Sequence, residues 1–199
     1  MNFAVLASGN GSNLQAIINA VKAGKIKGHL VLVVSDRENA FALKRARKAK
    51  VPTAFVDPKQ FSDRESFDRA VVEKLRQSSV DFVALAGFMR ILSSYFINAY
   101  RDKILNIHPA LLPAFKGSHA IKDALEYGVK VTGLTVHFVD EQVDHGVIIL
   151  QEAVPIHPTD TLEKLEKTMH SVEHKLYPKA IDLFARGKLE IRGRMVRLR

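Results

Sequence analysis

The chain has 199 residues, a formal net charge of +9 and no cysteine. This length suits one α/β domain with a full hydrophobic core, and the absence of cysteine excludes disulfides, thiolate metal sites and a cysteine nucleophile. No apolar run approaches the roughly 20 residues that a membrane-spanning helix needs, so we expect a cytoplasmic protein without a membrane partner.

The positive charge is spread along the chain, and its two densest runs are KRARKAK at Lys44–Lys50 and RGRMVRLR at Arg192–Arg199. We interpret the first as a solvated helix face and the second as a ragged chain end. Tryptophan is absent and most aromatic residues are Phe within apolar runs, so no stacking platform for bases is visible. A positive surface also suits small polyanionic substrates, and we expect no nucleic-acid partner.

A strand predicted at Phe3–Ala7 runs directly into the sequence SGNGSN and then into an amphipathic helix at Leu14–Val21. Glycine lets the backbone approach a ligand closely, and the free N–H groups and dipole of a helix start favour an anion. The pattern indicates a phosphate-binding loop. It is equally compatible with ordinary N-caps and an ordinary glycine turn.

Strands and helices alternate through the next part of the chain, which predicts a mostly parallel sheet. The expected strands are Leu30–Ser35, Thr53–Val56 and Asp81–Ala86. One helix is expected over Ala40–Lys50, ended by a residue that precedes proline, and another begins near Ser62 or Asp63. Arg64 lies in the first turn of that second helix, where a cation opposes the helix dipole.

The strand at Asp81–Ala86 leads into the sequence GFMRILS. Apolar residues surround Arg90 there, and such a rim suits a flat heteroaromatic ligand with a polar edge. The same residues also fit the core face of a following helix. Periodicity alone does not decide between these interpretations.

A short apolar strand, Ile104–Ile107, places Asn106 and His108 two residues apart before Pro109 ends it. Side chains alternate along a strand, so both face one side, at the carboxyl end where open α/β sheets bind ligands. An amide and an imidazole that converge on one oxygen suit a carbonyl that becomes an oxyanion. Alternatively, Asn106 caps a turn and His108 is a hydrogen-bonded, half-buried histidine.

The second half begins with a Pro- and Gly-containing loop at Ala110–His119 and a helix at Ile121–Tyr127. Two β-rich runs, Val131–Val139 and Val147–Val154, leave little room for a helix between them and should form an antiparallel hairpin. A long helix follows over Thr161–Arg186. We expect Asp160 to be its N-cap and Pro178 to kink or divide it.

His170, Glu173 and His174 share one flank of the long helix. Their spacing is compatible with a metal site, but no matching carboxylate motif accompanies them, so a solvated flank is the preferred interpretation and no metal is expected. The elements together predict a single domain over residues 1–199. It should be a Rossmann-like, open twisted sheet, mostly parallel with a C-terminal antiparallel hairpin and with helices on both faces.

In combination these motifs resemble the phosphoribosylglycinamide formyltransferase family, folate-dependent enzymes of purine synthesis. The resemblance covers nearly the whole chain and rests on VLASGNGSNLQAII, FVALAGFMRILS and ILNIHPALLPAFKGSHAIKDALEYGVKVTGLTVHFVDEQVDHGVIILQEAVPI. The last run indicates the wider formyltransferase superfamily, while SGNGSN and the short chain indicate this member. The resemblance implies formyl transfer from 10-formyltetrahydrofolate, a co-substrate, to the amine of glycinamide ribonucleotide.

By this resemblance Asn106, His108 and Asp144 form the catalytic trio. The amine attacks the formyl carbon, and the Asn106 amide and protonated His108 meet the developing oxyanion. Asp144 is expected to raise the pKa of His108 and so keep its proton available. An ordered water is expected to carry the proton from the amine to the folate nitrogen.

The resemblance also assigns residues to the two ligands. The substrate phosphate is placed at Gly11, Ser12 and Asn13, and the glycinamide or ribose end at His170, Ser171, Val172 and Glu173. Folate is placed at Arg64, Met89, Arg90, Ile91, Leu92, Asn106, Asp140, Glu141, Gln142, Val143 and Asp144. Residues 1–100 would thus form a nucleotide phosphate-binding half and residues 101–199 a catalytic and folate-binding half.

Other interpretations remain open. Methionyl-tRNA formyltransferase normally carries an additional tRNA-binding domain, for which we expect no room, and formyltetrahydrofolate hydrolase would leave the phosphate loop unexplained. A non-catalytic RNA-binding module would bind RNA in a salt-sensitive way that survives loss of His108. His119 and His137 also match family histidines, and His137 is expected to be structural, pointing inward from the hairpin. A monomer or a homodimer is expected.

Overall fold

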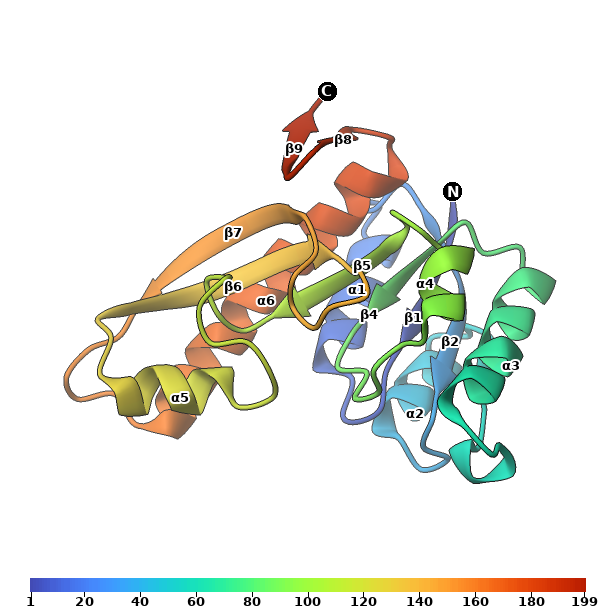
Figure 1. The fold of residues 1–199 in the computed structure, drawn as a ribbon, viewed down its shortest axis with the longest axis horizontal. Coiled ribbons are helices and arrows are strands. Elements are labelled where there is room, and N and C mark those ends of the chain that lie inside the picture. Colours follow the sequence, from blue (N-terminus) through green and yellow to red (C-terminus); the bar gives the residue numbers. More distant parts are fainter.

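The computed structural model describes all residues 1–199 and shows an open sheet with helices on both faces, beside a small carboxyl-terminal hairpin (Figure 1). The main-sheet strands are β1 (Asn2–Leu6), β2 (His29–Ser35), β3 (Thr53–Phe55), β4 (Phe82–Leu85), β5 (Ile104–His108), β6 (Val131–Phe138) and β7 (Ile148–Pro155). The hairpin strands are β8 (Leu189–Arg192) and β9 (Met195–Leu198). The helices are α1 (Ser12–Lys22), α2 (Phe41–Lys48), α3 (Arg64–Gln77), α4 (Ser94–Ala99), α5 (Ala120–Tyr127) and α6 (Leu162–Ala185), with a 3₁₀ turn, η1 (Pro58–Gln60).

The seven strands of the main sheet lie in the order β3-β2-β1-β4-β5-β6-β7. The first five strands are parallel, whereas β6 pairs antiparallel with both β5 and β7. The predicted fold class is therefore confirmed, including the hairpin next to the strand that carries Asn106 and His108. The predicted element bounds differ from the observed ones by a few residues at most.

The central strand β1 is buried on both faces because successive side chains alternate between two apolar layers. Phe3 and Val5 pack in one core with α1, α2 and α6. Ala4 and Leu6 pack in the other with α3 and α4. This two-sided burial explains the near-continuous apolar runs of the parallel strands.

The loops that follow β1 and β4 lie side by side at the carboxyl edge of the sheet. The Ser8 N–H donates to the carbonyl of Gly87 at 3.0 Å, and the Met89 N–H donates to the Ser8 hydroxyl at 2.9 Å. The direction in which successive strands are added to the sheet reverses between β1 and β4. Open α/β sheets bind ligands at such a point. The fold thus brings together the glycine-rich sequence and the GFMRILS sequence.

Helix α6 runs without division through Pro178, so of the two predicted effects the division is wrong. Proline removes one backbone N–H, but Pro178 itself is buried in the packed face of the helix. The N-cap is Thr161, whose hydroxyl accepts from the Lys164 N–H, and not the predicted Asp160. Asp160 instead accepts from the His157 N–H at 2.8 Å, which closes the preceding turn.

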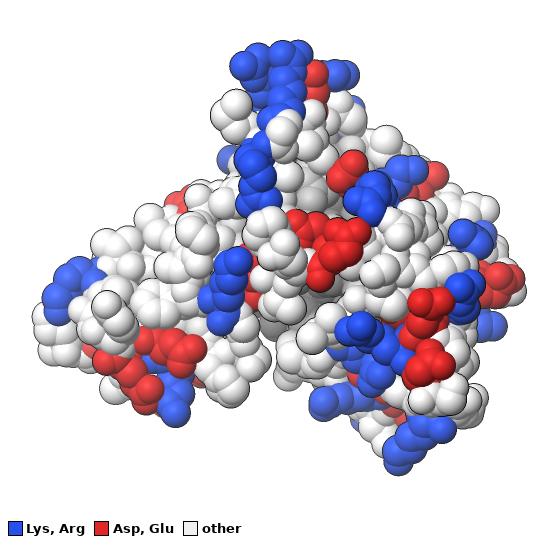
Figure 2. Space-filling view, viewed as in Figure 1, with Lys and Arg blue, Asp and Glu red and all other residues white.

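The basic tail is an ordered hairpin, which corrects the expectation of a ragged end. Leu189, Ile191 and Val196 pack against the main core, while Lys and Arg side chains gather on the projecting hairpin (Figure 2). Glu190 pairs with Arg192 at 2.8 Å and with Arg199 at 3.1 Å. Apolar and charged residues alternate within the tail, as they do in a strand with one buried face. The high charge of the tail made this pattern hard to recognise in the sequence.

None of the helices combines the length and the apolar character that a membrane crossing requires.

Tyr177 ties α6 to the two strands that lead into the site. Its fully buried hydroxyl lies 2.8 Å from the Leu85 carbonyl oxygen and 2.9 Å from the Leu105 carbonyl oxygen. We expect Tyr177→Phe to lower the free energy of unfolding by about 1–3 kcal/mol, because the one buried O–H that these two carbonyls share is lost. Urea unfolding measures this change. Tyr127→Phe is the control because Tyr127 is 81% exposed, and an equal effect in both variants would contradict the assignment.

Candidate active site

Strand β5 places Asn106 and His108 at the boundary between the parallel and antiparallel parts of the sheet. Asn106 pairs in register with His137 of β6, and His108 pairs with Thr135. The predicted pair therefore lies at the carboxyl end of β5, beside a strand whose own side chains are polar at the matching positions. Thr135 and His137 are both buried.

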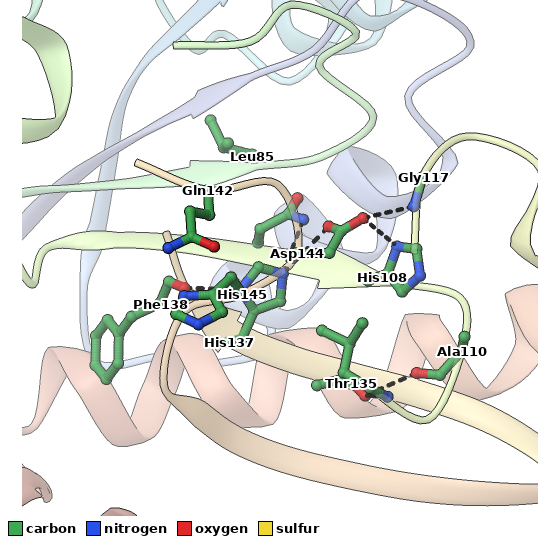
Figure 3. Close-up of polar contacts among 12 residues, drawn as sticks. Leu85, His108, Ala110, Gly117, Thr135, His137, Phe138, Gln142, Asp144 and His145 are labelled. Atoms are coloured by element: carbon green, nitrogen blue, oxygen red, sulfur yellow. Dashed lines mark hydrogen bonds and ion pairs between the residues drawn. The ribbon is translucent and has the colours of Figure 1, made fainter. Parts of the chain in front are cut away.

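A chain of polar contacts joins the predicted trio. Nδ2 of Asn106 lies 3.1 Å from Nε2 of His137, which lies 3.7 Å from Oδ1 of Asp144. Oδ2 of Asp144 lies 3.3 Å from Nδ1 of His108. Figure 3 shows the side chains of His108 and Asp144 pointing toward one another. The structure thus brings together residues 38 positions apart in sequence, Asn106 to Asp144.

His137 is buried, as expected for a structural residue, and it also orients Asn106. Its Nδ1 lies 2.7 Å from the Phe138 carbonyl oxygen, which only accepts hydrogen bonds, so Nδ1 carries a proton. Nε2 can then accept from the Asn106 amide. One N–H of that amide is engaged in this way, and the second is left for another acceptor.

His108 lies between two hydrogen-bond acceptors. Its Nε2 is 2.7 Å from the carbonyl oxygen of Phe115, and its Nδ1 faces the Asp144 carboxylate. Both contacts are satisfied together only when both ring nitrogens carry a proton. The geometry favours the imidazolium, which is the form that a general acid needs.

Burial opposes this preference. Desolvation lowers the pKa of His108 and outweighs the effects of Asp144 and the Phe115 carbonyl, which raise it. The predicted influence of Asp144 is correct in direction, but the predicted net rise of the pKa is wrong. The cause is that the ring is only 4% exposed, and burial disfavours the charged form of histidine.

Asp144 lies in the β6–β7 connection, where its backbone adopts a φ of 49°. The Gly117 N–H donates to its Oδ2 at 2.9 Å, which links this connection to the loop after β5 (Figure 3). Burial alone raises the pKa of the Asp144 carboxyl, but its polar surroundings, which include the Gly117 N–H and His108, lower it below its ordinary value. Asp144 is therefore a carboxylate at neutral pH.

Thr135 holds the backbone that follows His108, a role that the sequence alone did not reveal. Its buried hydroxyl donates to the Ala110 carbonyl at 2.7 Å and accepts from the Leu112 N–H at 3.0 Å. Gln151 of β7 donates to the same hydroxyl and to the Leu112 carbonyl, each at 3.0 Å. The only sequence signal was a polar residue inside an apolar strand.

The glycine-rich loop lines a cavity of about 560 Å³ at the carboxyl edge of the sheet. The cavity brings together predicted residues from both halves of the chain, namely Gly11, Ser12, Asn13, His170 and Glu173, with Gly87 and Met89. Ser171 and Val172 do not line it, because Ser171 is exposed elsewhere on α6 and Val172 packs against the core.

Glu173 joins the loop to α6. Its Oε2 accepts from Nδ2 of Asn13 at 3.0 Å and from Nδ1 of His170 at 2.9 Å. The contact with Glu173 raises the pKa of His170 although burial opposes it. Oδ1 of Asn13 is buried without a partner. The predicted solvated flank is thus part of a polar wall, and no cluster of three His, Asp or Glu side chains suited to a metal is present.

Gly11 requires glycine for two reasons. Its φ is 74°, and a Cβ there would lie 2.8 Å from the Cβ of Ala42. We expect Gly11→Ala to weaken binding of ribose 5-phosphate, a minimal phosphate probe, about tenfold, because the backbone strain of about 1–2 kcal/mol must shift the loop. Calorimetric titration measures this. Gly24→Ala is matched, with a φ of 68° and no atom within 4 Å, and should bind the probe normally.

The predicted folate residues divide into exposed and buried ones. Met89 and Ile91 are 66% and 59% exposed and form the expected apolar rim. The side chain of Leu92 instead packs in the core with Phe67, which corrects its assignment to the rim. The Arg90 guanidinium lies 4.6 Å from the centre of the Phe67 ring.

Asp68 connects the rim to α3 and was not found from the sequence. It is buried and accepts from the Ser93 N–H at the end of the rim loop. Burial raises the pKa of Asp68, and the charges of Arg64 and Arg90 act in the opposite direction. Two predicted folate residues, Arg64 and Arg90, thus lie near one buried carboxyl group.

The remaining predicted folate residues form a turn with internal contacts. Asp140 accepts from the Gln142 N–H at 3.0 Å and pairs with His145 at 2.7 Å. Glu141 pairs with Arg101 at 2.9 Å. Val143 is 52% exposed, which leaves an apolar side chain open beside Asp144.

A larger groove of about 790 Å³ lies between α1 and α6 on the outer surface. Its walls carry Lys25, Lys175 and Lys179 but none of the predicted catalytic residues. The smaller cavity, in contrast, reaches the strand of the polar network, because Ile107 and Pro109 on either side of His108 line it.

Comparison with known proteins places this geometry in a family. Residues 1–181 match the formyl transferase family. The phosphoribosylglycinamide formyltransferase of Bacillus subtilis is 45% identical over 179 residues, which cover 90% of this chain and 92% of that protein. The trifunctional purine biosynthetic protein adenosine-3 of Gallus gallus is 49% identical over 188 residues. This match covers 94% of the present chain, which spans only 19% of that longer protein.

Solved structures agree with the sequence comparison. The crystal structure of glycinamide ribonucleotide transformylase 1 from Symbiobacterium toebii superposes with a TM-score of 0.97 at 49% identity, covering 100% of this chain and 93% of that one. The family match, the full-length bacterial relative and this superposition all extend over the cavity and the polar network. The chain therefore belongs to the phosphoribosylglycinamide formyltransferase group of the formyl transferase family.

Proposed function

We propose that this chain transfers the formyl group of 10-formyltetrahydrofolate to the amine of glycinamide ribonucleotide in purine biosynthesis, giving formylglycinamide ribonucleotide and tetrahydrofolate. The observation that carries the proposal is the network of Asn106, His137, Asp144 and His108 beside the glycine-rich cavity. The network supplies donors for an oxyanion, and the cavity supplies N–H groups for a phosphate.

The amine attacks the formyl carbon, and negative charge develops on the formyl oxygen. The free N–H of the Asn106 amide and Nε2–H of His108 would stabilise that charge. Nε2 contacts the Phe115 carbonyl at present, so the formyl oxygen takes the place of this acceptor when substrate binds. Nδ1 remains directed at Asp144, which fixes the ring orientation.

Asp144 also has a proposed role in the proton transfers of the reaction, through the pKa of His108. The attacking amine loses a proton, and the folate nitrogen gains one as the bond between it and the formyl carbon breaks. The Asp144 carboxylate attracts the imidazolium and counteracts part of the burial effect on the pKa of His108. As negative charge grows on the formyl oxygen, His108 holds its proton more strongly. A water molecule beside these residues is the proposed carrier between the two nitrogens.

The phosphate is proposed to bind the N–H groups of Gly11, Ser12 and Asn13, at the start of α1. His170 and Glu173 line the same cavity and would hold the ribose or glycinamide hydroxyl and amide groups. Ser171 and Val172 would contribute through the backbone, because their side chains point elsewhere. This arrangement leaves the amine directed toward β5.

Folate is proposed to lie along the exposed rim of Met89 and Ile91, with its pterin against the turn from Asp140 to Asp144. Arg64 would attract the glutamate carboxylates. Arg90 and Leu92 would contribute backbone groups, since their side chains are directed at the Phe67 region.

A formyl-transfer assay on the purified protein tests the proposal. Deformylated folate and formylated product are followed with 10-formyltetrahydrofolate, in the presence and in the absence of glycinamide ribonucleotide. Product that forms only when the nucleotide is present supports the proposal. Deformylation without the nucleotide would instead indicate a hydrolase, and absence of turnover in both reactions would refute enzymatic formyl transfer by this chain.

A further inference from the structure

The glycine-rich loop is held from outside by helix α2. The Ala42 N–H donates to the Gly9 carbonyl at 3.1 Å, and Ala42 leaves no space for a Cβ at Gly11. One turn further along α2, Arg45 reaches over the same loop. The loop is therefore enclosed between α2 and the polar wall of α6 that contains Glu173.

Arg45 clamps Asn10, which lies at the centre of SGNGSN. Its Nε donates to the Asn10 carbonyl at 2.9 Å, and its Nη2 donates to the Asn10 side-chain oxygen at 2.8 Å. Its Nη1 donates to Oε1 of Gln15 in α1 at 3.3 Å. One planar guanidinium thus fixes both the backbone and the side chain of an exposed loop residue.

The charge of Arg45 is not neutralised by a carboxylate. Arg45 forms no ion pair in the structure, and all its acceptors are neutral amide oxygens. The Phe41 ring lies 4.7 Å from the guanidinium carbon and restricts it further. An unneutralised cation held beside N–H groups at a helix start increases the local preference for an anion.

We propose that Arg45 is a positioning residue for the substrate phosphate: it holds Asn10 so that the N–H groups of Gly11, Ser12 and Asn13 converge, and it adds positive charge behind them. This inference rests on the proposed function for the identity of the substrate. The other charged residues of the basic run Lys44–Lys50 are exposed, as expected for a solvated helix face, and Arg45 is the exception. Arg45 acts through the loop and touches no reacting atom.

Arg45→Met is expected to weaken binding of ribose 5-phosphate about tenfold, because hydrogen bonds of a charged group and its field are lost. Arg45→Lys should recover part of the affinity, since it keeps the charge but not the two-point contact. The matched control is Arg47→Met on the same helix, where Nε reaches only the Thr53 hydroxyl at 3.4 Å. Thermal unfolding of each variant verifies that the fold is kept.

A comparison of acceptors separates positioning from a general structural role. With glycinamide ribonucleotide, Arg45→Met should raise KM about tenfold and leave kcat within about twofold of the parent. With the acceptor that lacks the 5′-phosphate, kcat/KM should be the same in parent and variant. An equal loss with both acceptors, or a fall in kcat without a change in KM, would overturn the inference.

The titration with ribose 5-phosphate needs no turnover, so it distinguishes this inference from the proposed function. Arg45-dependent binding by a protein that transfers no formyl group would support the positioning role and refute the proposed function. If the parent transfers formyl groups but the Arg45→Met variant binds ribose 5-phosphate normally, the proposed function would be supported and the positioning role refuted. Absence of ribose 5-phosphate binding to the parent protein would overturn the positioning role.

Discussion

Replacing His108 with alanine is expected to lower kcat about 10²- to 10⁴-fold, the range for loss of a general acid or an oxyanion donor. The imidazole is placed between Asp144 and an acceptor position now filled by the Phe115 carbonyl. Its removal deletes the donor for the formyl oxygen and takes away one of the partners of Asp144. Affinity for ribose 5-phosphate should stay within about twofold of the parent, because the phosphate cavity is lined by the glycine-rich loop, the start of α1 and residues of α6, and His108 is not among its lining residues although Ile107 and Pro109 are.

Steady-state kinetics with glycinamide ribonucleotide, together with calorimetric titration of ribose 5-phosphate, measures both effects. His157→Ala is the matched control, since His157 is exposed in the turn before α6. His108 is buried, so His108→Gln provides a second variant that fills more of the space and still lacks the imidazole. A loss of phosphate affinity as large as the loss of kcat, in both variants, would contradict the separate roles. Activity within about tenfold of the parent would contradict a catalytic role.

The fold was predictable because its signals are local. Apolar runs such as Leu30–Ser35 are long enough to identify strands buried on both faces, and the glycine-rich sequence marks a strand-to-helix turn. Asn106 and His108 were found for the same reason, since residues two positions apart on a strand face the same side. The carboxyl-terminal hairpin was missed because its charge concealed the alternation of Leu189, Ile191 and Val196 with charged residues.

Contacts between distant residues were not predictable from local pattern. Thr135 reads as an ordinary strand residue until the register of β6 places it opposite His108. Asp68 reads as an exposed helix residue, yet it is buried beneath the end of the GFMRILS loop. Arg45 sits in a basic helix, and only the packing of α2 against Gly11 brings it to Asn10. Tertiary packing decides each of these roles.

The pKa of His108 illustrates the same limit. The resemblance predicted that Asp144 lies beside His108, and a neighbouring carboxylate raises the pKa of a histidine. It did not supply the degree of burial, which reverses the net direction. Two opposing influences on one group can be compared only when its surroundings are known.

Asp144→Asn is expected to lower kcat/KM at neutral pH by about 10²-fold or more, within the range for general acid catalysis. Asparagine keeps the shape of the side chain but not its charge. The negative charge of Asp144 raises the pKa of His108 against the effect of burial. Without it burial acts with less opposition, so the pKa of His108 falls further and less imidazolium is present at a given pH.

The pH dependence of kcat/KM shows in which direction the pKa of His108 changes in Asp144→Asn. The reaction requires protonated His108 and the neutral substrate amine. The pKa of His108 lies below its ordinary value, whereas an α-amino group titrates at about 8, so kcat/KM should rise with pH up to the pKa of His108 and fall above the pKa of the amine. In Asp144→Asn the break on the acid side should move to lower pH and the plateau above it should fall, while the alkaline limb, which is set by the amine, stays in place. The pKa of Asp144 is itself lowered, so the parent keeps this carboxylate charged throughout that range.

NMR titration of the His108 ring, in parent and variant, measures the pKa without turnover. Asp123→Asn is the control, because Asp123 is exposed on α5 and its loss should leave both the ring titration and the pH profile unchanged. If the His108 pKa stays constant in Asp144→Asn while activity falls, Asp144 acts through the orientation of the ring and the Gly117 contact and not through charge. If the pKa falls and the acid-side break follows it, the carboxylate is the group that keeps the buried imidazole protonated for transfer.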